Sequence, residues 1–264
     1  MAADLGALAA DLRAETAVLD ALLAPLDEPG WHLPTPAPGW TVLDQVTHLA
    51  FFDEITTIAA TEPARFRVLR DEASAAPEGP VESAVARSRH LSGAEAHAWL
   101  TRARAEMIEA LCACKPGARV SWFGPDMSPA SAMTARIMET WAHGQDIADA
   151  LGAEHPPTAA LRQVAHIGVR ALPNSFVARG LPVPSGPVYV ELSGPVGELW
   201  TWGDPDAADR VQGPALDFCL VATRRRHPDD ADLLVVGPVA EAWIPIAQAF
   251  AGPPGADPAP RGGR

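Results

Sequence analysis

Three side chains that can bind metals or move protons lie along one predicted helix. The segment MSPASAMTARIMETWAHGQDIADALG (127–152) carries Glu139, His143 and Asp146. Residues four positions apart on a helix project from the same side, about one turn apart, so Glu139 and His143 are expected to be neighbours. A carboxylate beside an imidazole can hold a transition metal, but the same pair is also common as a solvated contact on a helix surface. A metal site therefore requires a third ligand from elsewhere in the chain.

A candidate third ligand, His48, lies on another predicted helix, in the stretch WTVLDQVTHLAFFD. In an antiparallel helix bundle, His48, Glu139 and His143 can meet inside one cavity. Three protein ligands leave coordination positions open for water or substrate, and imidazole with carboxylate suits Zn²⁺ first, then Fe, Ni or Co. Asp44 and Asp146 lie one turn from His48 and His143, and either can orient an imidazole from behind. The spacing alone leaves both interpretations open, a metal site and an ordinary solvated pair.

The helices that must bring these ligands together are predicted from apolar residues at helical spacing and from capping residues. Thr41 followed by Asp44 indicates a capping box with Asp in place of the usual Glu, and Ser128 followed by Pro129 opens the helix of Glu139. The predicted helices cover residues 3–24, 41–60, 93–113, 128–152 and 157–179. Together they favour a helical bundle.

The sequence pattern changes after this helical part. PVYVELSG (187–194) and ELWTWG (198–203) alternate apolar and polar residues, which predicts a β-hairpin. RVQGPALDFCLVATRRR predicts a strand and a helix, ADLLVVG a further strand, and PVAEAWIPIAQAFAG a closing helix. We therefore expect an α+β protein with a helical domain over 1–182, a small α+β domain over 183–252 and a disordered tail over 253–264.

The composition limits the classes of partner and compartment. The 264 residues are 48% hydrophobic with a formal charge of −13, which allows a sizeable core and argues against nucleic acid and anionic membranes as partners. No apolar stretch is long enough to span a membrane, and the N-terminus lacks the features of a signal peptide. Three cysteines without a pairing framework, Cys112, Cys114 and Cys219, fit a reducing cytoplasm. We expect either a monomer or a homodimer.

Several segments of the chain resemble a known family. PGWTVLDQVTHLAFFDE, followed later by RIMETWAHGQDIADALG, is similar to the N-terminal domain of mycothiol-dependent maleylpyruvate isomerases, within the DinB-like metal-dependent superfamily. The likeness continues through GELWTWG and VQGPALDFCLVATRRRHPDD, and is nearest to an actinobacterial subgroup described only as maleylpyruvate-isomerase-like. The resemblance implies a DinB-like four-helix bundle followed by a small α/β domain similar to sterol-carrier or winged modules.

The same resemblance implies site residues and a cosubstrate. Carried onto this chain, the family's divalent metal, usually zinc, would be held by His48, Glu139 and His143. An arginine near the family's active site would correspond to one of the run Arg224–Arg226, with Arg225 as first choice, although a solvated helix end is the alternative. Family members use a low-molecular-weight thiol, mycothiol or bacillithiol. A metal at an open site would bind the thiol sulfur and lower its pKa, which gives a thiolate at neutral pH.

The implied reaction is thiol addition to a small electrophilic substrate, either an S-transfer or a cis–trans isomerisation. Two alternatives stay open: a metalloenzyme without thiol on the same scaffold, such as a hydrolase or a tailoring enzyme, and a small-molecule-binding protein without activity. Trp40 and Trp141 are our candidates for contacts with the thiol cosubstrate, against ordinary core packing. Basic residues near the motifs are few, mainly Arg136, Arg87 and Arg89. Because few cationic side chains are available to bind a dianion such as maleylpyruvate, we expect a bulkier or less charged electrophile.

Overall fold

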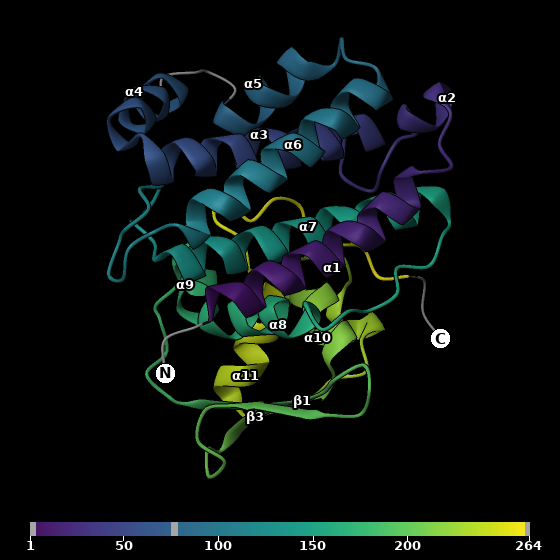
Figure 1. The fold of residues 1–264 in the computed structure, drawn as a ribbon. Helices are drawn as coiled ribbons and strands as arrows, with labels where there is room; N and C mark the ends of the chain where they lie inside the picture. Colours follow the sequence, from purple (N-terminus) through teal and green to yellow (C-terminus); the bar gives the residue numbers. More distant parts are fainter. Residues whose placement is uncertain (1–3, 75–78, 262–264) are drawn as a thin grey trace. The chain divides into compact units, whose positions relative to one another are not determined.

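The computed structural model describes residues 4–74 and 79–261, and the chain divides into two compact units, Met1–Pro156 and Pro157–Arg264 (Figure 1). The first unit is helical, whereas the second combines helices with a four-stranded sheet. The protein is therefore of the α+β class, as predicted.

The first unit is built around four long helices, which are α1 (Leu5–Leu23), α3 (Val42–Thr61), α6 (Gly93–Cys112) and α7 (Pro129–Leu151). α3 packs against α6 and α7, and α1 packs against α7, so the predicted four-helix bundle is confirmed. The predicted helices that carry His48 and Glu139 differ from α3 and α7 by one residue at each end. Three shorter helices pack beside α3 or each other: α2 (Glu28–Trp31), α4 (Pro63–Ser74) and α5 (Gly79–Ser88). Among the described residues, no helix is both long and apolar enough to cross a membrane.

Local sequence explains where the two ligand-bearing helices begin and end. The Thr41 hydroxyl accepts from the Asp44 N–H at 3.3 Å, and the Asp44 carboxylate accepts from the Thr41 N–H at 2.9 Å, which completes the predicted capping box. Ser128 accepts from the N–H of Ser131 at 3.1 Å and caps α7. α7 ends at Leu151, just before Gly152, whose φ of 59° is a left-handed conformation that side-chain-bearing residues rarely adopt.

α3 is the central helix of the bundle and is buried on nearly every side. It contains 20 residues, and the buried ones include polar side chains such as Gln45, His48 and Asp53. A helix without a solvent face must satisfy such groups inside the protein, because an unpaired polar group in the interior is costly. The polar residues of α3 therefore determine which neighbours the helix accepts.

Asp53 of α3 is the charged centre of the bundle. Its side chain has no exposed surface and accepts from Nε of Arg104 on α6 and, at 2.8 Å, from Nε of Arg136 on α7. Arg136 also donates to the carbonyl of Leu49 at 3.3 Å, and Arg104 donates to the hydroxyl of Thr16 on α1 at 2.7 Å. One carboxylate thus ties α3 to α6 and α7, and through Arg104 to α1.

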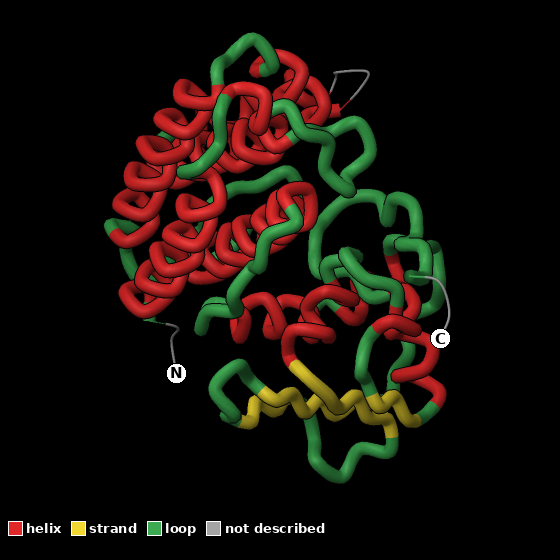
Figure 2. Tube along the Cα trace, turned by 90° about the vertical axis from the view of Figure 1, so that its right-hand side faces the viewer, coloured by secondary structure: helices red, strands yellow, loops and turns green. Residues whose placement is uncertain are grey.

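The second unit is a small sheet packed with helices, with the strand order β2-β1-β3-β4. β1 (Val188–Ser193) pairs antiparallel with β2 (Leu199–Trp202) and parallel with β3 (Asp209–Pro214), which pairs antiparallel with β4 (Leu234–Val236). α10 (Ala215–Ala222) and α11 (Pro238–Trp243) pack on this sheet, whose strands lie together in Figure 2. The predicted hairpin, the strand followed by a helix, and the further strand are all confirmed.

The closing helix is shorter than predicted. α11 ends at Trp243 and is followed by a single 3₁₀ turn over Ile244–Ile246. Pro245 explains this end, because proline has no N–H to donate and its ring disfavours a continuing helix. Residues 247–261 have no regular secondary structure. Residues 262–264 of the predicted tail lie outside the described residues.

The helical stretch predicted over 157–179 is divided into α8 (Leu161–Arg170) and α9 (Leu172–Val177). α8 packs on α10, and Gly168 permits the close approach, since a Cβ at this position would lie 2.9 Å from the ring of Phe218. Both helices lie in the unit Pro157–Arg264, whereas the sequence predicts a helical domain over 1–182.

The role of Asp53 can be tested by removing its charge. Asp53→Asn leaves two buried guanidinium groups without a counter-charge, so we expect the free energy of unfolding to fall by about 3–5 kcal/mol. Urea denaturation would measure the change. Asp71→Asn is the matched control, because this carboxylate forms an exposed pair with Arg70 at 3.0 Å, and its loss should cost less than about 1 kcal/mol. Equal stability of Asp53→Asn and the wild type would contradict the role of Asp53 as the counter-charge of the two buried arginines.

Candidate metal centre

His48 meets the Glu139–His143 pair inside the first unit. Nε2 of His143 lies 3.2 Å from Oε2 of Glu139, and Nε2 of His48 lies 3.5 Å from the same oxygen. One nitrogen or oxygen atom from each of the three side chains lies within 4.8 Å of the other two. Ligand atoms about 2.1 Å from a tetrahedral ion are about 3.4 Å apart, so these separations fit one divalent ion. No other group of His, Cys, Asp and Glu side chains has this geometry in the described parts of the chain.

The cluster is buried but is not sealed from solvent. The side chains of His48 and His143 are 9% and 11% exposed, whereas that of Glu139 is 24% exposed. Solvent therefore reaches the group at Glu139. Burial of the remaining surface strengthens the electrostatic interactions among the three side chains.

The charges of the cluster suit metal binding. Burial lowers the pKa of His48 to about 4, and the positive charges of His143 and Arg136 act in the same direction. Burial alone would raise the pKa of Glu139, but the hydrogen bonds from His143 and His48, together with their charges, hold it well below its usual value. A neutral imidazole and an ionised carboxylate are the forms that bind metals.

A hydrogen-bond chain fixes the ring of His143. Its Nδ1 hydrogen-bonds to Oε1 of Gln45, whose amide nitrogen donates to the Thr35 hydroxyl at 2.8 Å, which in turn donates to the Trp40 carbonyl at 3.0 Å. Because the Gln45 amide nitrogen is directed at Thr35, its oxygen must accept from His143. Nδ1 of His143 therefore carries a hydrogen, and in the neutral ring Nε2 presents a lone pair to the Glu139 carboxylate.

In this arrangement two hydrogen-bond acceptors, Nε2 of the neutral His143 ring and Oε2 of Glu139, face each other. A lone pair on Nε2 of His143 facing the Glu139 oxygen at 3.2 Å is favourable only if a proton or a cation lies between them. Nδ1 of His48 is also buried, and it finds no hydrogen-bond partner among the described residues. The lone pairs of the imidazole nitrogens and the Glu139 carboxylate therefore fit a bound cation better than a hydrogen-bond network among the three side chains.

Aromatic rings enclose the two imidazoles. The ring of Trp40 is stacked on that of His143, with centroids 5.9 Å apart and an interplanar angle of 9°, and its centroid is 5.2 Å from that of His48. Phe52, one turn further along α3, lies 4.8 Å from the His48 ring. Trp40 is half-buried, so part of its ring is exposed beside the cluster. A contact between Trp40 and the thiol cosubstrate stays a prediction.

The aromatic surface continues beyond Phe52 into the turn SWFGPDM. The ring of Phe52 lies 6.1 Å from that of Trp122 and 6.2 Å from that of Phe123, and both of these rings are half-buried. Val120 and Met127 close the turn with two backbone hydrogen bonds of 2.8 and 2.9 Å. An accessible apolar surface therefore extends from the imidazoles.

The first unit of the chain matches a known protein family. Residues 12–148, which include His48, Glu139 and His143, match the family model described as the mycothiol maleylpyruvate isomerase N-terminal domain. The chain belongs to this family. Residues 184–236 of the second unit match a further model, described as wyosine base formation.

Solved structures share the fold of this chain, and curated relatives match it over nearly its whole length. A crystal structure of the mycothiol-dependent maleylpyruvate isomerase superposes with a TM-score of 0.58 at 16% identity, over 88% of this chain and 93% of that one. A mutant of the same enzyme gives the same TM-score and coverage at 15% identity. Two uncharacterized proteins of Mycobacterium tuberculosis, from strains CDC 1551 / Oshkosh and ATCC 25618 / H37Rv, are 48% identical over 253 residues, covering 96% of this chain and 98% of each relative.

Trp141, a candidate for contact with the thiol cosubstrate, does not face the cluster. Trp141 lies two positions from both Glu139 and His143 on α7, so it projects from the opposite side of the helix. Its side chain is 1% exposed and its ring is stacked on that of His155, with centroids 5.8 Å apart, which is core packing. Arg225 belongs to the second unit and donates to the carbonyl of Thr223 at 2.8 Å. A role for Arg225 in the reaction stays a prediction.

The residues that orient the histidines differ from those we expected. The Asp44 carboxylate accepts from Thr41 and, at 3.0 Å, from Nε of Arg89, rather than from His48. Asp146 lies 3.9 Å from Nδ1 of His143, whose hydrogen bond is made by Gln45 instead. Gln45 was not predicted, although its position one turn before His48 in the stretch QVTH places it on the same side of α3.

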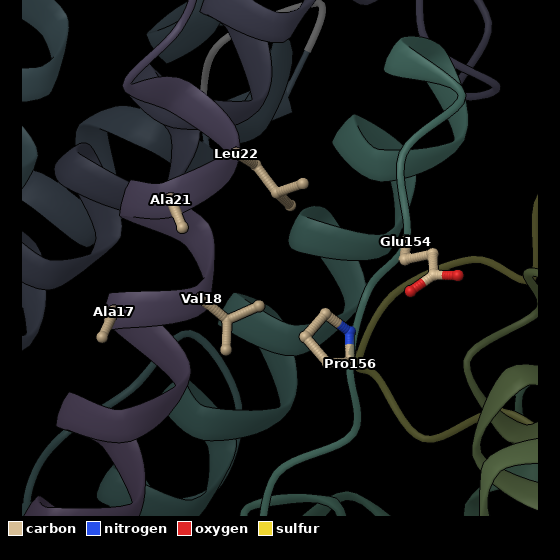
Figure 3. A pocket seen from close by; sticks show the side chains of 6 residues that line it. All are labelled: Ala17, Val18, Ala21, Leu22, Glu154 and Pro156. Atoms are coloured by element: carbon tan, nitrogen blue, oxygen red, sulfur yellow. The ribbon is translucent and has the colours of Figure 1, made fainter.

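A separate hollow of about 520 Å³ lies along α1 and shares no residue with the cluster (Figure 3). Its lining consists of Ala17, Val18, Ala21, Leu22, Glu154 and Pro156. Glu154 is the one titratable side chain in this lining, so the hollow lacks the donor set of a metal centre or the acid–base pair of a hydrolase.

The lowered pKa of His48 makes the stability of the metal-free protein depend on pH. Between pH 6.5 and about 4, His48 binds a proton in the unfolded chain but stays neutral in the folded protein. The free energy of unfolding therefore falls as the pH drops through this range. In His48→Gln the fall should be smaller by up to about 3 kcal/mol. Urea denaturation in the presence of a chelator would measure it, with the exposed His90→Gln as control. If the free energy of unfolding depended on pH identically in His48→Gln and the wild type, His48 would not be the group responsible.

Proposed function

We propose that the protein is a metal-dependent enzyme that uses a low-molecular-weight thiol, mycothiol, and acts on a small electrophile by S-transfer or cis–trans isomerisation. The observation that carries the proposal is the convergence of two imidazole nitrogens on one carboxylate oxygen, 3.2 and 3.5 Å away, in a chain of this family. Mycothiol and the isomerase activity come from the description of the family and of the similar crystal structures.

His48, Glu139 and His143 would hold the ion, and two imidazoles with a carboxylate favour Zn²⁺. A divalent ion bound there would act as a Lewis acid and lower the pKa of a thiol sulfur to give a thiolate at neutral pH. Gln45 keeps the Nε2 lone pair of His143 directed at the site. Burial and the charge of Arg136 keep His48 neutral and able to bind.

The protein's own thiols support the need for a thiol cosubstrate. Burial raises the pKa of Cys219 well above its usual value, and burial together with Cys112 raises the pKa of Cys114. A thiol is nucleophilic as the thiolate, so neither Cys219 nor Cys114 is activated. Cys112 is exposed at the end of α6 and does not belong to the cluster. The nucleophile at the ion is then best supplied by mycothiol, which a reducing cytoplasm keeps in its thiol form.

The surroundings of the cluster favour an electrophile with an apolar portion. Trp40 and Phe52 contact the imidazoles, and apolar groups bind well on such aromatic surfaces. Arg136 is paired with Asp53, and Arg89 is paired with Asp44, so neither is available to a substrate dianion. We propose a substrate that is bulkier or less charged than maleylpyruvate, with Arg225 as the candidate contact for an anionic group.

Cobalt substitution tests the thiol requirement directly. The Co²⁺-loaded protein should develop a thiolate-to-cobalt charge-transfer band in the near ultraviolet when mycothiol is added, and S-methyl mycothiol should produce none. Glu139→Ala should lose the cobalt and the band together. Gln45→Ala should weaken cobalt binding by about 10–100-fold because the ring of His143 is released, whereas Asp149→Asn, at an exposed carboxylate of the same helix, should change it little.

The same titration separates the alternatives. Cobalt binding without any band from mycothiol would contradict thiol use and favour a thiol-independent metalloenzyme on this scaffold. Failure of the wild type to bind cobalt, with full binding of a small apolar ligand, would favour the binding protein without activity.

A further inference from the structure

The end of α10 in the second unit carries an arginine where the backbone favours glycine. Arg224 has a φ of 63°, and it is the sole non-glycine residue with a positive φ in the described parts of the chain. The N–H of Arg224 donates to the Val221 carbonyl at 2.9 Å and that of Arg225 donates to Leu220 at 2.8 Å, the two bonds of a Schellman motif. Glycine usually occupies this position because a Cβ is strained there. The cost of keeping the side chain points to a use for its guanidinium.

The guanidinium of Arg224 is buried and incompletely paired. Its side chain is 7% exposed, and its terminal nitrogen donates to the Asp257 carboxylate and, at 3.2 Å, to the Ala256 carbonyl. Nε of Arg224, a terminal nitrogen of Arg179 and Nε of Arg226 are buried, and none of the three has a hydrogen-bond partner in the part of the chain that the structure describes. Buried donors are nearly always paired in proteins, so unpaired ones mark a place for an acceptor.

Two of these arginines converge on one carboxylate oxygen. Oδ1 of Asp257 accepts from Arg224 and, at 3.3 Å, from Arg179, while Arg226 is paired separately with Asp217 at 3.0 Å. The Asp257 side chain is 75% exposed, so it is held at one end and reached by solvent at the other. Arg224, and then Arg179, hold the pKa of Asp257 below its usual value. Asp257 is therefore an ionised carboxylate shared by two cations.

A hollow of about 180 Å³ adjoins the Arg224–Asp257 ion pair. Its polar lining consists of Arg224, Arg226, His227, Asp229 and Asp257, and Pro258 of the C-terminal segment also lines it. Such a volume suits a small molecule. Movement of the C-terminal segment would remove Asp257 and Pro258 from the lining and leave the cations behind.

We infer that Arg179 and Arg224 form a binding site for the carboxylate group of a small molecule, which Asp257 occupies as an internal ligand. The planar guanidinium presents parallel N–H donors that match a carboxylate, and Asp257 already uses the site in this way. An external carboxylate must displace Asp257, so the apparent affinity is reduced by the fraction of molecules in which Asp257 is bound. This site requires neither the metal nor the thiol of the proposed function.

Acetate is the probe, and its binding to the full chain can be followed by saturation-transfer NMR at an ionic strength held constant with sodium chloride. Asp257→Asn removes the internal competitor and should bind acetate about tenfold more tightly than the wild type. Arg224→Gly should lose the binding. This variant suits the left-handed backbone, so its melting temperature separates loss of the site from loss of the fold. Arg162→Gln, an exposed arginine of α8, is the matched control and should bind like the wild type.

The opposite results would overturn the inference. Acetate binding no tighter in Asp257→Asn than in the wild type would show that Asp257 does not occupy the site. Undiminished binding by a folded Arg224→Gly would show that the guanidinium is not the receptor. Binding of inorganic phosphate without binding of acetate would contradict the assignment to a carboxylate.

Discussion

The buried carboxylate of Asp53 is the constraint on which the helical unit depends. It lies five residues after His48 on α3 and is shared by Arg104 of α6 and by Arg136 of α7, which precedes Glu139 by three residues. The ion pairs therefore fix α3 against α7 close to the ligands. Because two guanidinium groups face one carboxylate, excess positive charge stays in the interior, and the charge of Arg136 helps to keep His48 neutral. The ion pairs of Asp53 thus hold the helices together and also help to keep His48 in the neutral form that binds a cation.

The elements with strong local signals were predictable. The capping box at Thr41, the Ser128 cap and Gly152 fixed both ligand-bearing helices to within one residue, because helix ends depend on side chains close in sequence. The division of 157–179 and the short α11 were missed, although Pro173 and Pro245 lie at these breaks. The packing of α8 on α10 could not be predicted, since Gly168 looks like any helical glycine until Phe218 is placed beside it.

The three candidate ligands were found from spacing and family resemblance, but their surroundings were not. Helical spacing places residues on one side of a helix without saying that α3 is buried all round, so Gln45 and Asp53 resembled surface polar residues. The same limit explains why Asp44 was expected to orient His48, and why helical spacing could not decide between cosubstrate contact and core packing for Trp141. Long-range pairs such as Asp53 with Arg104 and Arg136 leave no periodic signal, because they depend on three helices that meet only after folding.

The central claim is that His48, Glu139 and His143 hold one divalent ion. Elemental analysis of the protein purified without added metal, beside His48→Ala and Glu139→Ala, tests it most directly. The account predicts about one equivalent of metal, foremost zinc, in the wild type and its loss in both variants while their folds persist by circular dichroism. A wild type that carries little metal and recovers none on addition of Zn²⁺, or variants that retain the full equivalent, would contradict it.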